Sequence, residues 1–504
     1  MQQNKRPAHL HFLLFFSLSL AVFMVTLDYS IANISIPYIA GALSVNNDQG
    51  IYVITSFAVG GSIGLASSGY LATRFGEVRV VIISILLLSF FSFACGCSIN
   101  FTMLIIFRFI QGLVSGPVVP LSQSLIIQNT SKEKRAVAFS ILTTIIVVGP
   151  VIGPILGGYI SDWYQWRWIF YINIPIGILA AGAIWSILHK EESKTERVPF
   201  DLIGLLFLTC TITCLQIFLD KGQQWDWFRS PLILSLMAGF LISLILFFIR
   251  TFSCAHPFFD LKILKIGSFS IAMIILALSY AITFGTLVLI PFWLHQYMEY
   301  NSEWAGITVS ALGLAPLCFA LITPLLIRHF GNMRVVVLSL LFFTLGSFIS
   351  TLSTFQISAQ QIAFARFIFG FGFICYITPL ISMALEKVST AELPQAMGMY
   401  QFVRALSGGI GTSLFFTLWQ RRTIFHHDRI SSMLTQFNPI TPQLQNSVSK
   451  TLLNRSLDQQ AAILALNEVF YLMGFLLIGV ILLLLGWMLY QKIKLSRNPQ
   501  TTHL

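Results

Sequence analysis

Long apolar runs alternate with short polar clusters from residue 12 almost to the end of the chain. Each run reaches about 20 residues, the length an α-helix needs to cross about 30 Å of hydrocarbon. The first run is about twice as long as the apolar part of a signal peptide and has no small-residue cleavage site after it, so we expect it to be retained. The pattern predicts an all-α polytopic membrane protein with fourteen spans, at 12–32, 50–72, 79–98, 102–127, 136–160, 168–188, 201–219, 231–250, 268–294, 304–327, 333–353, 361–385, 397–419 and 466–490.

The composition favours the same class. Of the 504 residues, 56% are hydrophobic and 10% are charged, with a mean hydropathy of +0.81, whereas soluble domains carry about 25% charged residues. A soluble enzyme, a disordered scaffold and a disulfide-stapled secreted domain are therefore excluded. The seven cysteines lie nearly all within apolar runs without a CxxC pair, and the nine histidines show no HExxH spacing. The sequence thus predicts neither a metal site nor a cofactor.

The formal net charge of +11 indicates either a basic patch for nucleic acid or an orientation in the membrane. With the N-terminus in the cytoplasm, 19 of the 30 Lys and Arg residues fall in the tails and loops of the inner face. Eight fall on the outer face and three within spans. With nine acids on each face and one in the membrane interior, the net charge is +10 inside, −1 outside and +2 in the bilayer. The excess predicts cytoplasmic N- and C-termini and no nucleic-acid partner.

Two strings occur twice, which indicates an internal repeat. RFGEVRVV from Arg74 returns as HFGNMRVV from His329, and RFIQG from Arg108 returns as RFIFG from Arg366. We expect two six-helix bundles around an extra helix pair, with a substrate cavity at the bundle interface near the membrane midplane. The expected division is a cytoplasmic tail 1–11, an N-terminal bundle 12–188, two additional linker helices in 201–250, a C-terminal bundle 268–419 and 466–490, a periplasmic loop 420–465 and a cytoplasmic tail 491–504.

Two motifs resemble those of the major facilitator superfamily. The loop GYLATRFGEVR resembles its signature loop, in which glycines allow close packing and charged residues tie helices together, although Thr73 and Glu77 depart from the pattern. The candidate gating residues are Gly69, Arg74, Gly76 and Arg79. The run GPVIGPILGG in span five resembles its antiporter motif, with a helix face free of side chains and prolines that favour a kink. Its residues are Gly149, Pro150, Gly153, Pro154, Gly157 and Gly158. For the loop, the alternative is that its arginines simply anchor at lipid headgroups. For the glycine–proline run, the alternative is ordinary packing between helices.

Longer strings resemble one branch of this superfamily. LDYSIANISIP, WRWIFYINIPIG and LDKGQQWDWF resemble the fourteen-span drug:proton antiporters, and AILALNEVFY is similar to the EmrB-type multidrug exporters. The resemblance covers essentially the whole chain. It implies the major-facilitator fold in a bacterial inner membrane and the export of small lipophilic substrates against protons. It also implies that a periplasmic adaptor and an outer-membrane channel dock to the protein. For the loop 420–465, a solvated hairpin without a partner is the alternative.

Four ionisable residues lie well inside the predicted spans: Asp28, Arg108, Arg366 and Arg404. A charge at the bilayer centre costs on the order of 2.5–3.5 kcal/mol on insertion scales, so each needs a partner or an aqueous cavity. Asp28 and Arg108 share a depth of roughly 7–9 Å below the outer boundary, and we expect them to pair when the cavity is dry. Asp28, the only acid within the membrane, is the expected proton carrier. A static ion pair that merely orders the bundle is the alternative.

The second repeat lacks this acid. Arg366 occupies the repeat position of Arg108, but span nine contains no Asp or Glu, so we expect carbonyls, hydroxyls or water as partners and leave packing and transport roles open. Arg404 either snorkels to the inner surface or acts in gating and substrate contact. Three arginines against one acid favour neutral or anionic substrates. Further candidates for the cavity, which fit the bundle core equally well, are Met24, Tyr280 and Phe284.

The function expected from these features is secondary active export by alternating access. The chain contains neither a GxxxxGK[ST] motif for ATP nor a GxSxG nucleophile motif. An uptake or facilitative carrier of the same fold is the alternative, which the glycine–proline motif of span five disfavours. A membrane receptor or enzyme would need a polar catalytic cluster or a large ligand-binding domain, and the longest extramembrane stretch, 420–465, has only 46 residues.

Overall fold

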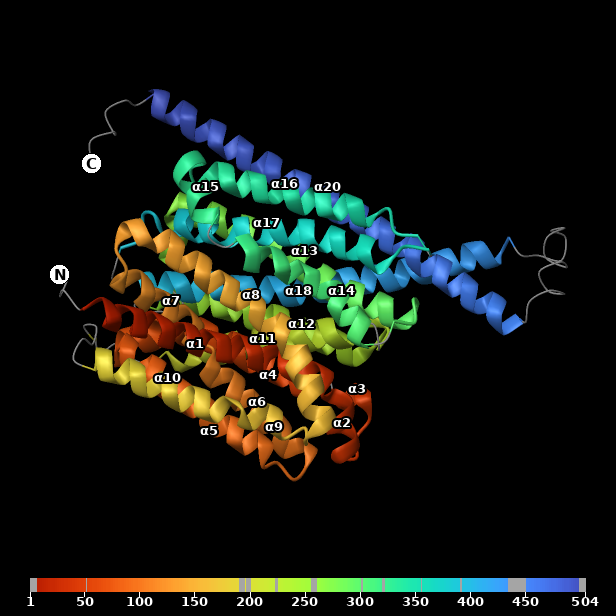
Figure 1. The fold of residues 1–504 in the computed structure, drawn as a ribbon, viewed down its shortest axis with the longest axis horizontal. Coiled ribbons are helices and arrows are strands. Elements are labelled where there is room, and N and C mark those ends of the chain that lie inside the picture. The colour runs from red at the N-terminus through yellow and green to blue at the C-terminus, as the bar shows by residue number, and fades with distance from the viewer. Residues whose placement is uncertain are drawn as a thin grey trace. The chain divides into compact units, whose positions relative to one another are not determined.

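The computed structural model describes residues 7–497 except 51, 190–194, 196–200, 223–224, 255–260, 301, 320–321, 355, 390–391 and 434–449. All regular secondary structure in these residues is helical (Figure 1), which confirms the all-α class. The elements are α1 (Ala8–Ile34), α2 (Ile36–Ala42), α3 (Asn47–Gly50), α4 (Tyr52–Phe75), α5 (Glu77–Gly96), α6 (Phe101–Ser115), α7 (Val118–Asn129), α8 (Lys132–Trp163), α9 (Trp168–Tyr171), α10 (Asn173–Leu188), α11 (Leu202–Lys221), η1 (Trp227–Arg229), α12 (Pro231–Ser253), η2 (Leu261–Lys265), α13 (Gly267–Gln296), α14 (Ser302–Phe319), α15 (Ile322–Phe330), α16 (Asn332–Ser350), α17 (Ala359–Leu385), α18 (Leu393–Ser431) and α20 (Lys450–Arg497).

Ten of the described helices are long and apolar enough to cross a membrane, or up to eleven if the bent pair α14 and α15 forms one span. The chain is therefore a multi-span membrane protein. Each of the fourteen predicted runs overlaps a described helix or two consecutive ones. The ten do not include the runs 50–72, 136–160, 304–327 and 397–419, so the count of fourteen spans stays a prediction. In α4, eight glycines and serines lower the mean hydropathy.

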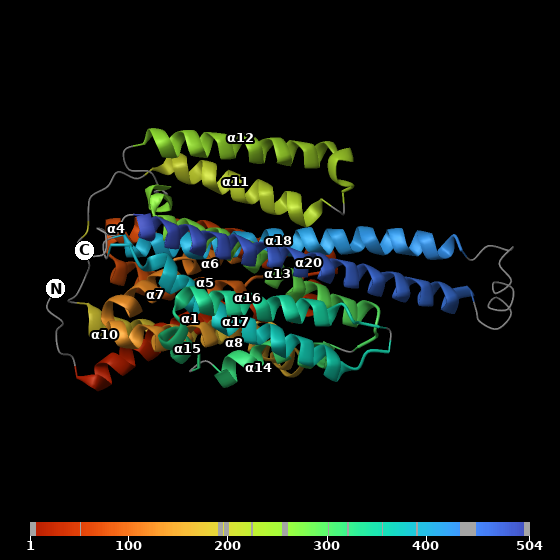
Figure 2. The same cartoon turned by 90° about the horizontal axis from the view of Figure 1, so that it is seen from above.

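The chain divides into two compact units. The first contains Met1–Ser270 and Ala384–Leu406, and the second contains Ile271–Met383 and Ser407–Leu504. The additional helices α11 and α12 belong to the first unit and run side by side as a helical hairpin (Figure 2). The aromatic rings of Phe218 and Trp227 pack edge to face at 5.3 Å where the chain reverses. The domain boundaries expected from the sequence remain predictions.

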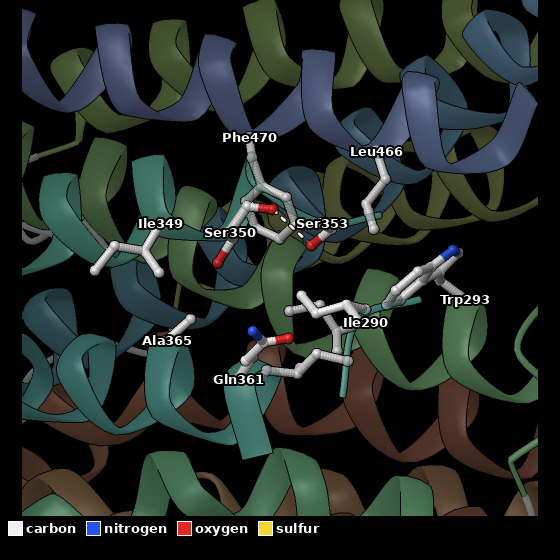
Figure 3. Close-up of a pocket in the computed structure, with 11 residues that line it drawn as sticks. Ile290, Trp293, Ile349, Ser350, Ser353, Gln361, Ala365, Leu466 and Phe470 are labelled. Carbon is white, nitrogen blue, oxygen red and sulfur yellow. Dashed lines mark hydrogen bonds between the residues drawn. The ribbon is translucent and has the colours of Figure 1, made fainter. Parts of the chain in front are cut away.

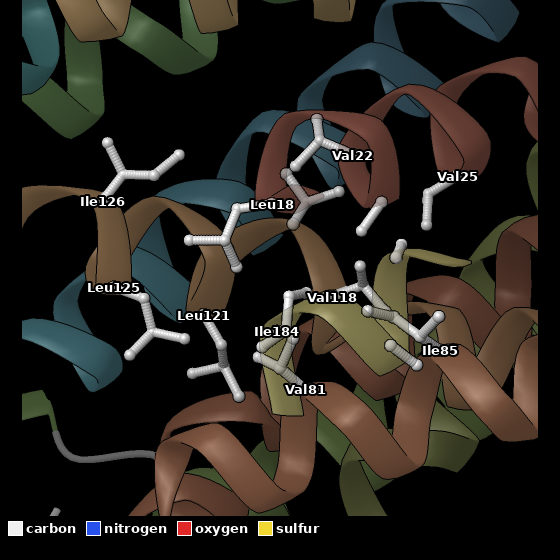
Figure 4. Packing of buried hydrophobic residues seen from close by; sticks show 14 of the residues in the cluster. Leu18, Val22, Val25, Val81, Ile85, Val118, Leu121, Leu125, Ile126 and Ile184 are labelled. Carbon is white, nitrogen blue, oxygen red and sulfur yellow. The ribbon is translucent and has the colours of Figure 1, made fainter. Parts of the chain in front are cut away.

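Helix α1 forms the centre of the first unit, where it packs against α7, α8 and α10. Its long apolar run covers all sides of the helix, which is typical of a buried position. Leu18 and Val22 of α1 face Leu121 and Leu125 of α7, with Ile184 of α10 beside them (Figure 4). These five side chains are at most 4% exposed. The polar residues farther along α1 are therefore held on a closely packed helix.

The two sequence repeats adopt the same local backbone. Gly76 precedes α5 with φ of 93°, and its counterpart Gly331 precedes α16 with φ of 81°. Glycine reaches this left-handed region without the steric penalty of a Cβ. The second repeated string ends at Gly112 in α6 and at Gly370 in α17. Gly112 lies against the backbone of Phe57, and Gly370 lies against the backbone of Leu312. The repeat thus encodes the same turn and the same close helix contact in each half.

The segment 420–465, expected as a loop, continues two helices over much of its length. Helix α18 runs to Ser431 and α20 begins at Lys450, and residues 434–449 lie outside the described part. The two arms run side by side beyond the ends of α16 and α17 (Figure 1, Figure 2). Trp419 Nε1 donates to the Ala462 carbonyl at 3.0 Å. The arms are helical because apolar positions recur in α20 at helical spacing, among them the buried Ala461, Ala462, Ala465, Leu466 and Val469.

Candidate functional site

The candidate site centres on Asp28, which lies on α1 in the first unit. Its carboxylate is fully buried, and Oδ2 lies 3.1 Å from Nη1 of Arg108 on α6, itself also fully buried. The expected pairing of these two residues is therefore confirmed. A buried ion pair is held by further hydrogen bonds in most proteins, because each charge has lost its water shell.

Asn173 supplies such a bond to the carboxylate. Its Nδ2 donates to Asp28 Oδ1 at 2.9 Å and contacts Ser92 Oγ at 3.1 Å. Ser92 in turn donates to the Phe170 carbonyl at 2.7 Å, so residues of α5, α9 and α10 are tied to α1. Sequence analysis missed Asn173 as a functional residue, although a single amide in the apolar run 168–188 was the signal that could have found it. The carboxylate is thus bound from two sides.

Arg108 has a second set of partners on α4 and α6. Its Nη1 also donates to Gln111 Oε1 at 2.9 Å, and its Nε donates to the Val53 carbonyl at 3.3 Å. The rings of Phe57 and Phe170 lie 4.3 Å and 5.4 Å from the guanidinium carbon. Gln111 was also missed, although its spacing of three residues from Arg108 places both on one helix face.

Three polar atoms of this network have no hydrogen-bond partner among the residues that the structure describes. They are Nη2 of Arg108, Nε2 of Gln111 and Oδ1 of Asn173. An unsatisfied buried polar group costs about 1–3 kcal/mol, so the network has open capacity for water or a polar ligand. No cluster of three or more His, Cys, Asp or Glu residues suited to a metal occurs within the described ranges.

The glycine face of α8 packs directly onto this part of α1. A Cβ at Gly149 would collide with the Thr26 side chain, one at Gly153 with the Ser30 side chain, and one at Gly157 with the Ile31 carbonyl. Ser30 also donates to the Gly149 carbonyl at 3.3 Å. Thr26 and Ser30 flank Asp28 on α1, so the spacing of the two helices at the ion pair depends on this face.

The remaining residues of the same motif differ in exposure. Pro150 is exposed and Gly158 is half-buried, while the side chain of Pro154 lies outside the described part. The close approach of α8 to α1 is thus a property of the three glycines at four-residue spacing.

The predicted gating loop joins α4 to α5. Arg74 Nη1 donates to the Tyr70 hydroxyl at 3.0 Å, and Arg79 is exposed. A Cβ at Gly69 would lie 2.6 Å from Cα of Gln395, which is within the same unit. The unusual Glu77 is buried, and its Oε2 accepts a hydrogen bond from Gln128 Nε2 at 2.8 Å. This acid therefore ties the start of α5 to the end of α7.

Arg366 lies on α17 in the second unit and is 1% exposed. Its Nη2 donates to Ser350 Oγ at 3.1 Å, as expected for a hydroxyl partner. The rings of Phe369 and Phe470 lie 5.1 Å and 5.6 Å from its guanidinium carbon. Its Nε and Nη1 have no partner in the described part of the chain. Arg366 is thus buried at the position of Arg108 with a hydroxyl in place of a carboxylate.

The other cavity candidates are divided between the two units. Met24 is fully buried in the apolar core of the first unit, where its sulfur lies 3.4 Å from the Cβ position of Gly177. Arg404 is half-buried on α18 in that unit. In the second unit the rings of Tyr280 and Phe284 stack at 4.6 Å. Their roles in substrate binding stay predictions.

Comparison with known proteins places this geometry in a family context. The sequence matches the Major Facilitator Superfamily over residues 18–412. It is 37% identical over 481 residues to the Multidrug export protein EmrB of Haemophilus influenzae, covering 92% of this chain and 93% of that protein. It is 35% identical over 467 residues to the Fatty acid resistance protein FarB of Neisseria gonorrhoeae, covering 90% and 91%. The human organic anion transporter MFSD10 has a similar fold, with a TM-score of 0.58 at 13% identity over 94% of this chain and 100% of that chain.

Proposed function

Because the chain belongs to the major facilitator superfamily, we propose that it is a proton-coupled exporter of hydrophobic and amphipathic compounds that are neutral or anionic. The relatives named as a multidrug export protein and a fatty acid resistance protein support this assignment. Export is secondary active and proceeds by alternating access. The protein resides in a bacterial inner membrane with both termini in the cytoplasm, and it raises resistance to the compounds it carries.

The observation that carries this proposal is the buried ion pair between Asp28 and Arg108. Arg108 and Asn173 stabilise the charged carboxylate of Asp28. A proton that binds Asp28 removes this charge and weakens the contact with Arg108. The protonated state then favours a different packing of α1, so proton binding and helix rearrangement are linked.

The glycine face of α8 gives this rearrangement a route. Since Gly149, Gly153 and Gly157 carry no side chains, α1 lies against α8 with few interlocking groups. A smooth contact lets two packings of α1 exchange without large repacking. In this proposal α8 is the surface along which the helix bearing Asp28 moves.

The decisive experiment removes the proton site alone. Asp28→Asn has the same size and still hydrogen-bonds, but it cannot carry a proton. In proteoliposomes with an imposed pH gradient, we expect this variant to insert normally and to lose proton-linked export of anionic and neutral lipophiles. Full activity of Asp28→Asn contradicts the proposal. Net uptake of the compounds by the unmodified protein under the same gradient favours the carrier alternative.

A matched control is available in the same unit. Asp201 is 4% exposed and forms an ion pair with Arg250 at 2.9 Å. It caps α11 through the backbone nitrogen of Gly204. Asp201→Asn therefore removes one buried, arginine-paired carboxylate remote from Asp28 in sequence, and we expect export to remain proton-linked.

We further propose that the segment 420–465 docks a periplasmic adaptor, which connects the protein to an outer-membrane channel. The paired arms of α18 and α20 support this role because they hold the segment on rigid helices. Arg422 of α18 contacts both carboxylate oxygens of Glu468 on α20, at 2.5 Å and 2.8 Å. Exchange of residues 434–449 for a short Gly–Ser linker keeps these contacts. We expect the exchange to abolish resistance in cells with two membranes and to spare transport in proteoliposomes; unchanged resistance contradicts docking.

A further inference from the structure

The paired arms of α18 and α20 are held by two kinds of contact, all within the second unit. Leu466 and Phe470 of α20 line one small recess with Trp293 of α13 (Figure 3), and each of the three is 1% exposed. The other contacts are polar and join arginine and histidine side chains of α18 to carboxylates of α20. Apolar packing does not change when a proton binds, so a response of the arms to pH must come from the polar contacts.

One of the two histidine contacts shares its acid with an arginine. His426 Nε2 lies 3.0 Å from Glu468 Oε1, and Arg422 contacts both oxygens of the same carboxylate. Because arginine is always protonated in proteins, Glu468 keeps a counter-charge whatever the state of His426. A proton on His426 would place a second cation beside Arg422, so this contact should depend little on pH.

His427 lies between two acids instead. Its Nε2 is 3.4 Å from Asp458 Oδ1 of α20, and its Nδ1 is 3.8 Å from Asp428 Oδ1 of its own helix. The His427 side chain is 29% exposed, and its Nε2 makes no hydrogen bond among the described residues. No ion pair in the described part of the chain joins Asp428 or Asp458 to a lysine or an arginine. A proton on His427 therefore supplies the positive charge that these two carboxylates lack.

The end of α13 completes the surroundings of Asp458. Burial and the negative charge of Asp458 raise the pKa of Tyr297, so this phenol stays neutral at physiological pH. Gln459 Nε2 donates to the Tyr297 carbonyl at 2.7 Å, and Arg455 of α20 pairs with Glu299. The outer part of α20 is thus already tied to the end of α13, and its contact with His427 of α18 is the one that a proton can strengthen.

We propose that His427 and Asp458 form a pH-operated clasp between the two arms. An imidazole takes up its proton between about pH 8 and pH 5. Protonated His427 pairs with Asp458, so the arms are held most firmly at acidic pH, and this stabilisation is lost as the pH rises through the same range. The clasp lies outside the predicted spans and does not involve Asp28. It lets the proton concentration on the outer side set how firmly the arms hold the chain between them, which goes beyond the proposed export mechanism.

Hydrogen–deuterium exchange of the full-length protein in nanodiscs tests the clasp. Exchange of residues 423–431 in α18 is followed at pH 5.5 and pH 7.5, with labelling times scaled to the intrinsic exchange rate at each pH. A partly exposed ion pair changes an equilibrium by about twofold to fivefold, so we expect protection to be higher by this factor at pH 5.5. Helix α16 of the same unit is the internal reference and should show no such difference.

Four variants identify the group that responds. We expect His427→Gln and Asp458→Asn to remove most of the pH difference in residues 423–431. His426→Gln removes the neighbouring histidine and should keep the difference, which makes it the matched control. His427→Lys carries a charge at both pH values and should give high protection at both, so the test remains decisive if a neutral variant loosens the arm at every pH.

The outcomes either support the clasp or overturn it. Equal protection at the two pH values in the unmodified protein overturns it, as does a difference of the same size in α16. A pH difference that survives in His427→Gln and disappears in His426→Gln overturns it as well. In Asp28→Asn the difference should persist. If that variant keeps full export while its arms still respond to pH, the proposed export mechanism fails and the clasp stands.

Discussion

Arg108 and Arg366 occupy the same place in the two repeats and meet different partners. Both are at most 1% exposed, and each has an aromatic ring near its guanidinium, at 4.3 Å for Arg108 and 5.1 Å for Arg366. At 3.1 Å, Arg108 contacts the carboxylate of Asp28, and Arg366 contacts the hydroxyl of Ser350. The two sites thus share burial and packing, and they differ in charge balance.

This difference separates what the fold needs from what the function needs. In both repeats a glycine lies four residues after the arginine, Gly112 in the first and Gly370 in the second. Each of these glycines touches the backbone of a neighbouring helix. The acid is kept in one repeat alone, which means that the helix packing does not demand it. This difference supports the proposal that Asp28 is the proton site.

The largest effect is expected from removing Arg108, and it is compared with the removal of Arg366. Arg108→Gln leaves Asp28 as an unpaired buried charge, so we expect a loss of about 3–5 kcal/mol in stability. Arg366→Gln removes a charge that has no counter-charge among the described residues, so we expect little loss or a gain. Thermal unfolding in detergent compares the two variants.

A double variant sharpens this comparison. Asp28→Asn combined with Arg108→Gln removes both charges together and should recover most of the stability that Arg108→Gln loses, without restoring proton-linked export. Equal destabilisation by the two single arginine variants is the result that breaks the contrast between the repeats.

A loss of stability of intermediate size, equal in the two repeats, is expected when Gly112 or Gly370 is replaced. A Cβ at Gly112 would collide with the Phe57 carbonyl, and one at Gly370 with the Leu312 carbonyl. We expect Gly112→Ala and Gly370→Ala each to destabilise by about 1–3 kcal/mol, because overpacked helices must move apart. The control is Gly182→Ala on α10, where nothing lies within 4 Å. Thermal unfolding measures all three, and a loss confined to one repeat argues against shared packing.

The smallest effect is expected from an exposed ion pair in the same unit as Arg366. Arg422 and Glu468 are bonded through two contacts, but their side chains are 37% and 39% exposed. Exposed pairs contribute about 0–1 kcal/mol, so Glu468→Gln should scarcely change the unfolding temperature. A loss as large as that of Arg108→Gln shows that burial does not control the strength of these pairs.

Much of the site could be read from the chain, because depth in a membrane follows from position along a span. The common depth of Asp28 and Arg108 predicted their contact, and the spacing of Gly149, Gly153 and Gly157 predicted a close helix approach. The identity of the approaching helix was not predictable, since small residues specify how near a neighbour comes and not which one. The structure shows that this neighbour is α1, the helix that bears Asp28.

Other features depended on contacts that no local pattern encodes. Asn173 reaches Asp28 across 145 residues of sequence, and its run of apolar neighbours is the same whether its amide faces lipid or core. The apolar spacing in 443–466 is partly helical and indicated the start of α20, but nothing in the sequence indicated that α18 continues to Ser431 and pairs with it.

By itself the sequence determined a membrane protein of apolar helices, an internal repeat, and a few buried charges, because hydropathy and periodicity are properties of neighbouring residues. Tertiary structure decided which charge is balanced. It brought Asn173, Gln111 and the glycine face of α8 to the Asp28 region, and it left Arg366 with the hydroxyl of Ser350 as its partner. These partners come from distant helices, and only the packing of those helices determines which polar groups meet.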